Sequence, residues 1–561
     1  MTFCRMLFSV FCGVFLFIVP LKGQYTAEFN SYSSFDELLK SSNPEVQEHI
    51  RVIGEDSATN KALDMFVCDS AMFEKFTSVK SVVFNHARVL LIDRECFSGM
   101  NFLRKVDLRL NHLTFIDLKS FRTSDEMKIN TLDLSWNYIT RMESSDVVLP
   151  ELENLEVSHN KLKSVIITSD GFPEIYSVNA DNNHISEIDL ESETLEYLSL
   201  DGNRIKSFEG SRILLPRLKA ISIKDNQLTM ISSEMFLSLI SLKTLYLNNN
   251  FIHSVDLQKL NVSLSLDLSR NSIKTMDKVL LPTTLPIRLT LDSNKLLYLE
   301  SRRHLNNVEL FFCKICSFHL IEPFFLANSL KNILQLDLFH NYLTTANIFN
   351  AQRDFKLTSV NLVYNKIRKI GKNDFFRLTN VTDLFLSYND IRIVAEGAFD
   401  RMEKLKILYL SNNLIFQLPA NIFDANSLHS LHIDGNNMPF FRIPGWQETT
   451  GALIESNSTL NNLYILYIQN NPLQCECVNL IRKWAGSNRI HLIIDNFNTT
   501  RGLQPACIVN NLGCRTDVGK DLVKDYWHLF NPIKLENLIL QDEDEESVLV
   551  TRFKPSKVTN F

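Results

Sequence analysis

Apolar and polar positions follow one frame along most of this chain. In residues 405–415, "LKILYLSNNLI", apolar side chains occupy positions 1, 4, 6 and 11 of the frame, and asparagine occupies position 9. Each frame predicts one short strand, in which positions 4 and 6 point into a core and positions 3, 5 and 7 point outwards. The asparagine recurs in fifteen frames, at Asn111, Asn137, Asn160, Asn183, Asn203, Asn226, Asn250, Asn271, Asn294, Asn341, Asn365, Asn389, Asn413, Asn436 and Asn471.

An asparagine that turns inward at position 9 needs hydrogen-bond partners, which the backbone of neighbouring turns can supply. Two further frames fit with substitutions. One comprises Val79, Val82, Phe84, Ala87 and Val89; the other comprises Leu305, Val308, Leu310, Cys313 and Ile315, with Cys313 at the asparagine position. The set resembles the leucine-rich repeat. That resemblance implies an α/β solenoid over residues 79–473: a horseshoe of about 17 units with a parallel β-sheet on its concave face and an irregular convex side. Phenylalanines on the convex side, Phe97, Phe236, Phe375 and Phe399, predict a second buried row.

The N-terminal residues 1–23 are typical of a secretory signal peptide, because Arg5 precedes an apolar run at residues 6–20. A membrane anchor there is the alternative. No later segment approaches 18 apolar residues, so we expect no membrane span and an extracellular mature protein. Residues 24–78 are predicted to form an N-terminal cap segment, with a short helix over residues 36–53. Residues 515–561 are predicted to form an acidic, partly disordered tail.

Ten cysteines are present, and eight of them follow the signal peptide, an even number that suits disulfides in a secreted protein. Residues 470–490, "NNPLQCECVNLIRKWAGSNRI", resemble the cysteine-flanked C-terminal cap of Toll-type receptor ectodomains and Slit-like proteins, here residues 474–514. The resemblance implies that Cys475 pairs with Cys507 and Cys477 with Cys514. Zinc binding by these four is the alternative, which the Cys-x-Cys spacing disfavours. Disulfides are also considered for Cys68 with Cys96, and for Cys313 and Cys316, whose spacing matches a redox motif and whose expected burial favours a structural role.

Charge and motifs exclude several functions. The net charge is -6, which offers no basic excess for nucleic acid. The sequence contains no nucleophile elbow, metal-spaced histidine pair or phosphate-binding glycine loop, so we expect no enzyme, cofactor or metal site. Four sequons, at Asn261, Asn380, Asn457 and Asn498, are candidate glycosylation sites in a secreted chain.

The outward positions change character along the chain, from acidic residues such as Asp107, Asp133 and Glu156 to aromatic ones. Exposed aromatic clusters are typical of binding sites. The candidate ligand-binding patch comprises Phe311, Phe339 and Val363 at position 7, and Phe385, Tyr409, His432 and Tyr467 at position 5. The alternative is that these side chains pack on one another and stabilise the sheet. An insertion between Asn436 and Asn471, which includes Trp446, borders this region.

We therefore expect a secreted, non-catalytic recognition protein that binds a protein ligand, a co-receptor or a microbial-surface glycan. The signal peptide, irregular repeats and cap are similar to those of Toll ectodomains and, more weakly, of secreted insect leucine-rich immune proteins, although this chain lacks their coiled coil. That resemblance implies a role in innate immunity. Three alternatives remain: an extracellular-matrix, cell-adhesion or neuronal guidance protein; a Toll-like receptor ectodomain without its membrane anchor; and a secreted enzyme whose site lies in the N-terminal segment or the tail, which the absence of catalytic motifs disfavours. Dimerisation is left open.

Overall fold

The structure is a computed structural model with two compact units, residues 1–272 with 278–285 and residues 273–277 with 286–561. It describes residues 26–29, 48–53, 66–68, 73, 76–94, 96–121, 128–143, 148–299, 305–322, 324–349, 351–419, 422, 427–443, 462–494, 507 and 514. The predicted signal peptide at residues 1–23, the predicted tail at residues 515–561, Trp446, Asn457 and Asn498 all lie outside these residues.

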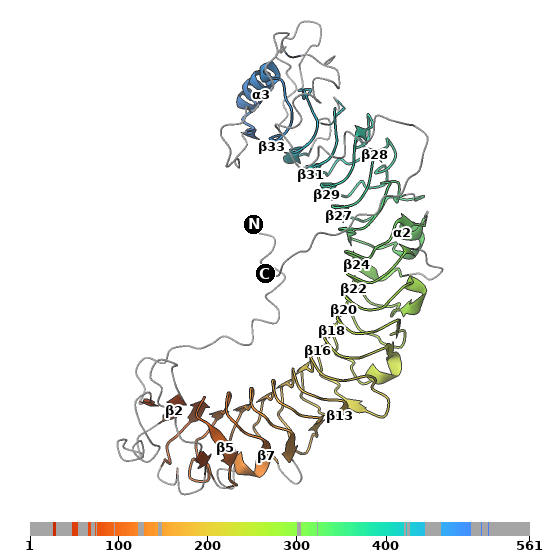
Figure 1. The fold of residues 1–561 in the computed structure, drawn as a ribbon. Coiled ribbons are helices and arrows are strands. Elements are labelled where there is room, and N and C mark those ends of the chain that lie inside the picture. Colours follow the sequence, from red (N-terminus) through yellow and green to blue (C-terminus); the bar gives the residue numbers. More distant parts are fainter. Residues whose placement is uncertain are drawn as a thin grey trace, which may run out of the picture. The chain divides into compact units, whose positions relative to one another are not determined.

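In the first unit, short parallel strands follow one another in chain order along one sheet (Figure 1). They are β1 (Thr26–Phe29), β2 (His49–Ile53), β4 (Ser81–Asn85), β6 (Lys105–Asp107), β8 (Thr131–Asp133), β10 (Asn154–Glu156), β12 (Ser177–Asn179), β14 (Tyr197–Ser199), β16 (Ala220–Ser222), β18 (Thr244–Tyr246) and β20 (Leu264–Asp267). The return side carries smaller parallel sheets, formed by β3 (Phe66–Cys68) with β5 (Val89–Ile92), β7 (Phe115–Asp117) with β9 (Arg141–Glu143), β11 (Ser164–Ile167) with β13 (Glu187–Glu191) and β15 (Arg212–Leu214), and β17 (Met230–Ser232) with β19 (Ser254–Asp256) and β21 (Val279–Leu280).

The second unit repeats this arrangement. Its long sheet comprises β22 (Ile287–Thr290), β24 (Val308–Phe312), β26 (Gln335–Asp337), β27 (Ser359–Asn361), β29 (Asp383–Phe385), β31 (Ile407–Tyr409), β32 (Ser430–His432), β33 (Ile465–Tyr467) and β34 (His491–Ile493). The return side has β23 (Tyr298–Leu299) with β25 (Leu320–Ile321), and β28 (Lys369–Ile370) with β30 (Ile393–Val394).

Helix is sparse in the described residues of both units. The α-helices are α2 (Phe325–Ser329) and α3 (Cys475–Ser487), and the 3-10 turns are η2 (Leu118–Phe121), η3 (Ser233–Phe236) and η4 (Met276–Lys278).

The asparagine at position 9 links each turn to the one before it. Asn365 is typical: its Nδ2 donates to the Leu338 carbonyl of the preceding turn at 3.0 Å and to Leu362 of its own turn at 3.1 Å. Its Oδ1 accepts the Leu343 backbone N–H at 3.1 Å. The side chain is only 6% exposed, so these bonds satisfy a polar group that would otherwise be costly to bury. We call the stacked series the asparagine ladder.

The predicted phenylalanine row on the return side is buried. Phe97, Phe236 and Phe375 are fully buried and Phe399 nearly so. Rings of successive turns stack within it, with 5.9 Å between the centroids of Phe375 and Phe399. Each turn therefore has two apolar layers, one under the strand and one under the return segment.

The prediction for the cysteine-containing turn was wrong by three residues. Strand β24 has a register irregularity against β22 at Ile287 and Arg288, and Phe311, not Val308, pairs with Leu336. The frame there is Val308, Phe311, Cys313, Cys316 and Phe318, all fully buried, and Cys316 occupies position 9. Both frames place apolar residues at a spacing of three, so the pattern alone did not separate them.

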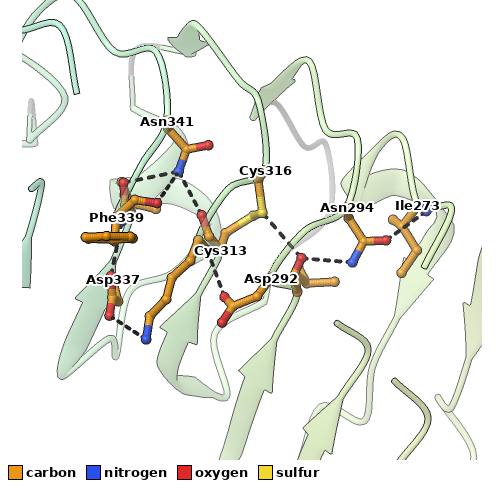
Figure 2. The surroundings of a disulfide bond; sticks show 11 residues. Ile273, Asp292, Asn294, Cys313, Cys316, Asp337, Phe339 and Asn341 are labelled. Atoms are coloured by element: carbon orange, nitrogen blue, oxygen red, sulfur yellow. Dashed lines mark hydrogen bonds and ion pairs between the residues drawn. A yellow bond between two sulfur atoms is a disulfide. The ribbon is translucent and has the colours of Figure 1, made fainter. Parts of the chain in front are cut away.

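A disulfide replaces the ladder asparagine in that turn. Cys316 Sγ lies 3.3 Å from the Leu291 carbonyl oxygen, where other turns place an amide, and Figure 2 shows this contact. Because Cys316 is bonded to Cys313, its sulfur has no proton to donate. On the following turn, Asn341 still donates to the Cys313 carbonyl at 2.8 Å, but its buried Oδ1 has no hydrogen-bond partner. The ladder is therefore interrupted on both sides of the disulfide.

Loss of the asparagine also changes the backbone. Position 8 has a positive φ in nearly every described turn, whereas position 10 has one only at Arg88 (56°) and Ser317 (67°). These two residues follow Ala87 and Cys316, the two residues that replace asparagine in the described frames. The asparagine thus holds position 10 in an ordinary conformation, and its absence permits the left-handed one.

The N-terminal segment contains strand where a helix was predicted. Of residues 36–53, only 48–53 are described, and His49–Ile53 form β2, which pairs in parallel with β4. Strand β1 pairs in turn with β2. The sheet therefore begins before the first predicted unit. In the segment "HIRVI" polar and apolar residues alternate with the period of a strand over its first four positions.

A candidate binding surface on the parallel sheet

Four aromatic side chains form one stacked row on the outward face of the second unit's sheet. Phe385, Tyr409, His432 and Tyr467 are directly opposite one another in the registers of β29, β31, β32 and β33. Their centroids are 5.1, 3.8 and 4.1 Å apart in that order, with interplanar angles of 27°, 13° and 12°. All four are half-buried. We call them the aromatic row.

Stacking decides which ring surfaces a ligand can reach. The faces of Tyr409 and His432 are covered by their neighbours on both sides. The row therefore presents ring edges and polar tips, and the positive edge of an aromatic ring attracts the face of another ring or an acceptor. Alternating apolar residues extend the surface, since Ile407 and Ile465 at position 3 are also half-buried.

Burial sets the charge state of the row. It lowers the pKa of His432 to about 4, so the imidazole is neutral at physiological pH, and one ring nitrogen, Nε2, lies 2.8 Å from Ser430 Oγ. Burial, followed by the nearby Tyr467, Asp383 and Asp434, raises the pKa of Tyr409. The row itself therefore carries no charge.

The position-7 part of the predicted patch was wrong at one residue. Phe311 is fully buried in the core, because the frame is displaced as described above. The outward aromatic of that turn is Phe312, which has Arg288 and Lys314 over its ring at 5.0 and 5.9 Å. Phe339 and Val363 do lie on the outward face, half-buried, on successive turns.

Sequence reasoning missed a second line of aromatics at position 8. Tyr364 and Tyr388 stack at 4.3 Å and are 42% and 44% exposed, and His340 and Phe339 adjoin Tyr364 at 5.9 and 5.4 Å. Position 8 leaves the strand with a positive φ, so strand alternation does not describe where its side chains point. The signal available in the sequence was the recurrence of aromatics one residue before the ladder asparagine.

The first unit has its own stacked pair at position 8. Trp136 is 53% exposed and stacks on His159 at 3.7 Å, while Asn182 on the next turn approaches His159 Nε2 at 3.3 Å. Burial lowers the pKa of His159. Beside this pair, the sheet face is acidic.

Three carboxylates occupy adjacent position-5 sites on that face. Asp107, Asp133 and Glu156 are register partners on β6, β8 and β10. The Arg109 side chain donates hydrogen bonds to Asp107 from Nε at 3.0 and 3.1 Å and from Nη2 at 2.6 Å, and the Arg109 backbone N–H donates to it at 3.3 Å. Burial raises the pKa of Asp133, and burial with the repulsion of Asp133 raises that of Glu156 to about 7. Arg109 Nε also lies 3.7 Å from Asp133 Oδ2, so Glu156 is the one carboxylate of the three without a basic partner among the described residues.

The eight cysteines that the structure describes form four disulfides. Cys475 is joined to Cys507 and Cys477 to Cys514, the pairing that the resemblance implied. Cys68 is joined to Cys96, and Cys313 to Cys316. Among the described residues no group of three or more histidine, cysteine or acidic side chains is arranged to hold a metal ion.

The two described sequons differ in their surroundings. Asn261 is exposed, and its Oδ1 accepts a hydrogen bond from Thr284 at 2.7 Å. Asn380 is half-buried: its Nδ2, the atom that would carry a glycan, donates to the Phe355 carbonyl at 3.1 Å, and Lys404 donates to its Oδ1 at 2.7 Å. A glycan on Asn380 would be attached to an atom that already forms a bond between two turns.

Comparisons with known proteins agree on the repeat. The family description "Leucine rich repeat" matches residues 193–252, 216–273 and 355–415, and "BspA type Leucine rich repeat region" matches residues 65–146. The chain is a leucine-rich repeat solenoid of about 16 turns with a long parallel sheet and little helix. In the part that the structure describes, no helix is long and apolar enough to cross a membrane.

The similarity to individual proteins is distant. Tsukushi from Gallus gallus is 28% identical over 196 residues, which are 33% of this chain and 52% of Tsukushi. Toll-like receptor 2 from Bison bison is 25% identical over 197 residues, 34% of this chain and 24% of the receptor. The chain thus spans about half of the first relative and a quarter of the second. Among solved structures, the Drosophila Toll–Spatzle complex superposes with a TM-score of 0.52 at 16% identity, over 85% of this chain and 69% of that one. That last likeness concerns the fold alone.

Proposed function

We propose that this protein is a secreted, non-catalytic recognition protein that binds a protein ligand through the aromatic row, in innate immunity. The observation that carries the proposal is the row itself, four half-buried aromatics in register on a sheet face. Aromatic side chains supply large contact area at little conformational cost and are enriched at binding hot spots.

The comparisons support this reading at the level of the protein class. Toll, whose fold is similar, is solved in a complex with Spatzle, and Toll-like receptor 2 is similar in sequence. Four disulfides favour an oxidising compartment, in keeping with secretion. A protein ligand is favoured over a glycan because a sugar ring packs on an open aromatic face, and the faces within the row are covered.

The test compares capture of extracellular partners by two variants. Phe385→Ala with Tyr409→Ala removes half of the aromatic row and should weaken binding at least tenfold, because hot-spot side chains are worth roughly 2 kcal/mol or more. Phe376→Ala is the matched control, since Phe376 is a 38% exposed phenylalanine that carries Arg377 and Arg401 over its ring and lies outside the sheet.

Partners that bind wild type and the Phe376 variant, but not the double variant, support the proposal. Thermal unfolding of each variant checks that the fold is retained. If every captured partner binds the double variant at wild-type strength, the row is not the binding surface and its role is to stabilise the sheet.

A further inference from the structure

The outward face around the aromatic row has a one-sided charge pattern. On the four turns that carry the row, positions 3, 5 and 7 hold two carboxylates, Asp383 and Asp434, and neither lysine nor arginine. The remaining members are apolar, aromatic or uncharged polar: Phe385, Ser387, Ile407, Tyr409, Ser411, Ser430, His432, Ile465, Tyr467 and Gln469. Lys406 and His429 lie outside this set, at position 2 of their turns.

Neither carboxylate is neutralised by a basic side chain of the described residues. Asp383 accepts a hydrogen bond from Thr382 Oγ1 at 2.6 Å, and Asp434 accepts one from Ser411 Oγ at 2.6 Å. Both acids are half-buried. Asp337 on the same unit's sheet face differs, since Lys314 Nζ is paired with it at 3.2 Å. Unpaired, half-buried carboxylates are electrostatically favourable sites for a cation brought by a partner.

The two carboxylates flank Tyr409 symmetrically. Asp383 lies one turn before Tyr409 and two frame positions earlier; Asp434 lies one turn after it and two positions later. With strands about 4.8 Å apart and about 3.3 Å per residue, the two backbones are separated by ~16 Å, with Tyr409 near the midpoint. In an extended peptide, residues i, i+2 and i+4 share one face, and the first and last of them are ~13 Å apart. Two flexible basic side chains at i and i+4 can bridge the difference between this distance and the ~16 Å that separates the backbones of the two carboxylates.

We propose that the partner docks an extended segment diagonally across the row, with basic side chains at Asp383 and Asp434 and an apolar or aromatic side chain between them on the edge of Tyr409. This inference rests on the proposed function and specifies the partner at the same surface. Charge complementarity sets orientation and partner choice, while the aromatic row supplies contact area.

Three synthetic decapeptides test the proposal with the whole chain rather than a fragment of it. All contain a central phenylalanine in a Gly/Ser background; the first carries Lys-x-Phe-x-Lys, the second Glu-x-Phe-x-Glu, and the third has both lysines at one end. Fluorescence anisotropy at low and moderate salt gives the affinities. The first peptide should bind at least tenfold more tightly than either of the others, and added salt should reduce that difference.

Variants separate this inference from the proposed function. Asp383→Asn with Asp434→Asn should remove the preference for the lysine peptide while keeping the fold, and Asp374→Asn, on the return segment, is the control that should leave it intact. Equal binding of the lysine and glutamate peptides, or no binding of any peptide, overturns the inference. A captured partner lost by the Phe385/Tyr409 double variant but kept by the double asparagine variant overturns only the charge pattern and leaves the proposed function standing.

Discussion

Single residues decide how regular each turn can be. The ladder asparagine has two roles. At Asn365 it bonds a carbonyl and an N–H of the preceding turn as well as carbonyls of its own turn, and it keeps position 10 out of the left-handed region. Where alanine or cysteine replaces it, position 10 adopts a conformation that costs an L-residue roughly 1–2 kcal/mol. Ser317 is one of the two residues that bear this cost.

Ser317→Gly should therefore stabilise the protein. Glycine avoids the left-handed penalty, and its greater freedom in the unfolded chain offsets part of the gain, which leaves about 0.5 kcal/mol. Ser272→Gly is the matched control, because Ser272 occupies position 10 of a turn that has its asparagine and has no positive φ. Urea unfolding should show opposite shifts of midpoint for the two variants. Equal shifts would mean that the conformation at Ser317 costs nothing.

Glu156 should make stability depend on pH. Its pKa is raised to about 7, from an ordinary value of 4.5, chiefly by burial. The folded state then binds a proton that the unfolded state has lost, so unfolding free energy should fall as pH rises from about 4.5 through 7. Glu156→Gln cannot ionise and should flatten this dependence, with its largest stabilisation relative to wild type near pH 8. Melting temperatures of both proteins at pH 5 and pH 8 test the sign. A difference between the two proteins that is constant with pH would contradict the assignment.

At the scale of elements, the cysteine turn shows how a disulfide can stand in for the ladder. The bond between Cys313 and Cys316 joins positions 6 and 9 of one turn, the two positions that the asparagine amide otherwise connects. The disulfide holds the turn in shape but supplies no donor to Leu291 and no acceptor to the preceding turn. Its contribution is local, whereas that of an asparagine is shared between turns.

Restoring the ladder should replace the disulfide without loss of stability. Cys313→Leu with Cys316→Asn reinstates the frame seen in other turns, and each buried hydrogen bond regained is worth about 1 kcal/mol. A four-residue loop gives a disulfide roughly 2 kcal/mol in the chain-entropy model. The variant should unfold within about 1 kcal/mol of wild type, whereas Cys313→Ser with Cys316→Ser should be clearly less stable. Denaturation curves of both variants give their free energies of unfolding. An equal loss of unfolding free energy in the two variants would show that asparagine cannot complete this turn.

The same turn shows why the sequence predicted most of the fold but only part of the surface. Each of fifteen frames has an asparagine at position 9, so the positions of the strands and of the buried rows followed directly from the pattern. Leu305, Val308 and Phe311 are equally spaced, and without an asparagine nothing in the pattern chose between frames. The choice of the earlier frame therefore assigned Phe311 to the outward face, whereas its side chain is buried in the core. Tyr364 and Tyr388 were missed for another reason: they follow the strand, and their direction depends on a positive φ that alternation does not encode.

At the scale of the whole molecule, stability in a solenoid is the sum of turns and of contacts between neighbours, so the ends need protection. Helix α3 packs against β34 and buries Trp484, Ile481 and Val478. Two disulfides, from Cys475 and Cys477, anchor the start of this helix. The last turns of the second unit include β33, which carries Tyr467 of the aromatic row.

Damage to α3 should loosen the turns nearest to it first. Trp484→Ala removes a side chain that is 5% exposed and should cost roughly 3–5 kcal/mol locally. Hydrogen exchange should then increase in β33 and β32, while β16 and β18 of the first unit stay protected. Trp136→Ala, at a 53% exposed tryptophan, is the control and should leave exchange at β33 unchanged. Uniform loss of protection across both units would contradict nearest-neighbour stabilisation.

The stacked pair of Trp136 and His159 can serve as an intrinsic fluorescence probe. Their rings are 3.7 Å apart, close enough for a protonated imidazole to quench indole emission. Because burial lowers the pKa of His159, the quenching should set in only below the ordinary histidine range. The chain has four tryptophans, so only the part of the emission that changes with the protonation of His159 reports on these two adjacent turns of the first unit. A pH titration of fluorescence, compared with His159→Gln, would turn this stack into a local probe of folding.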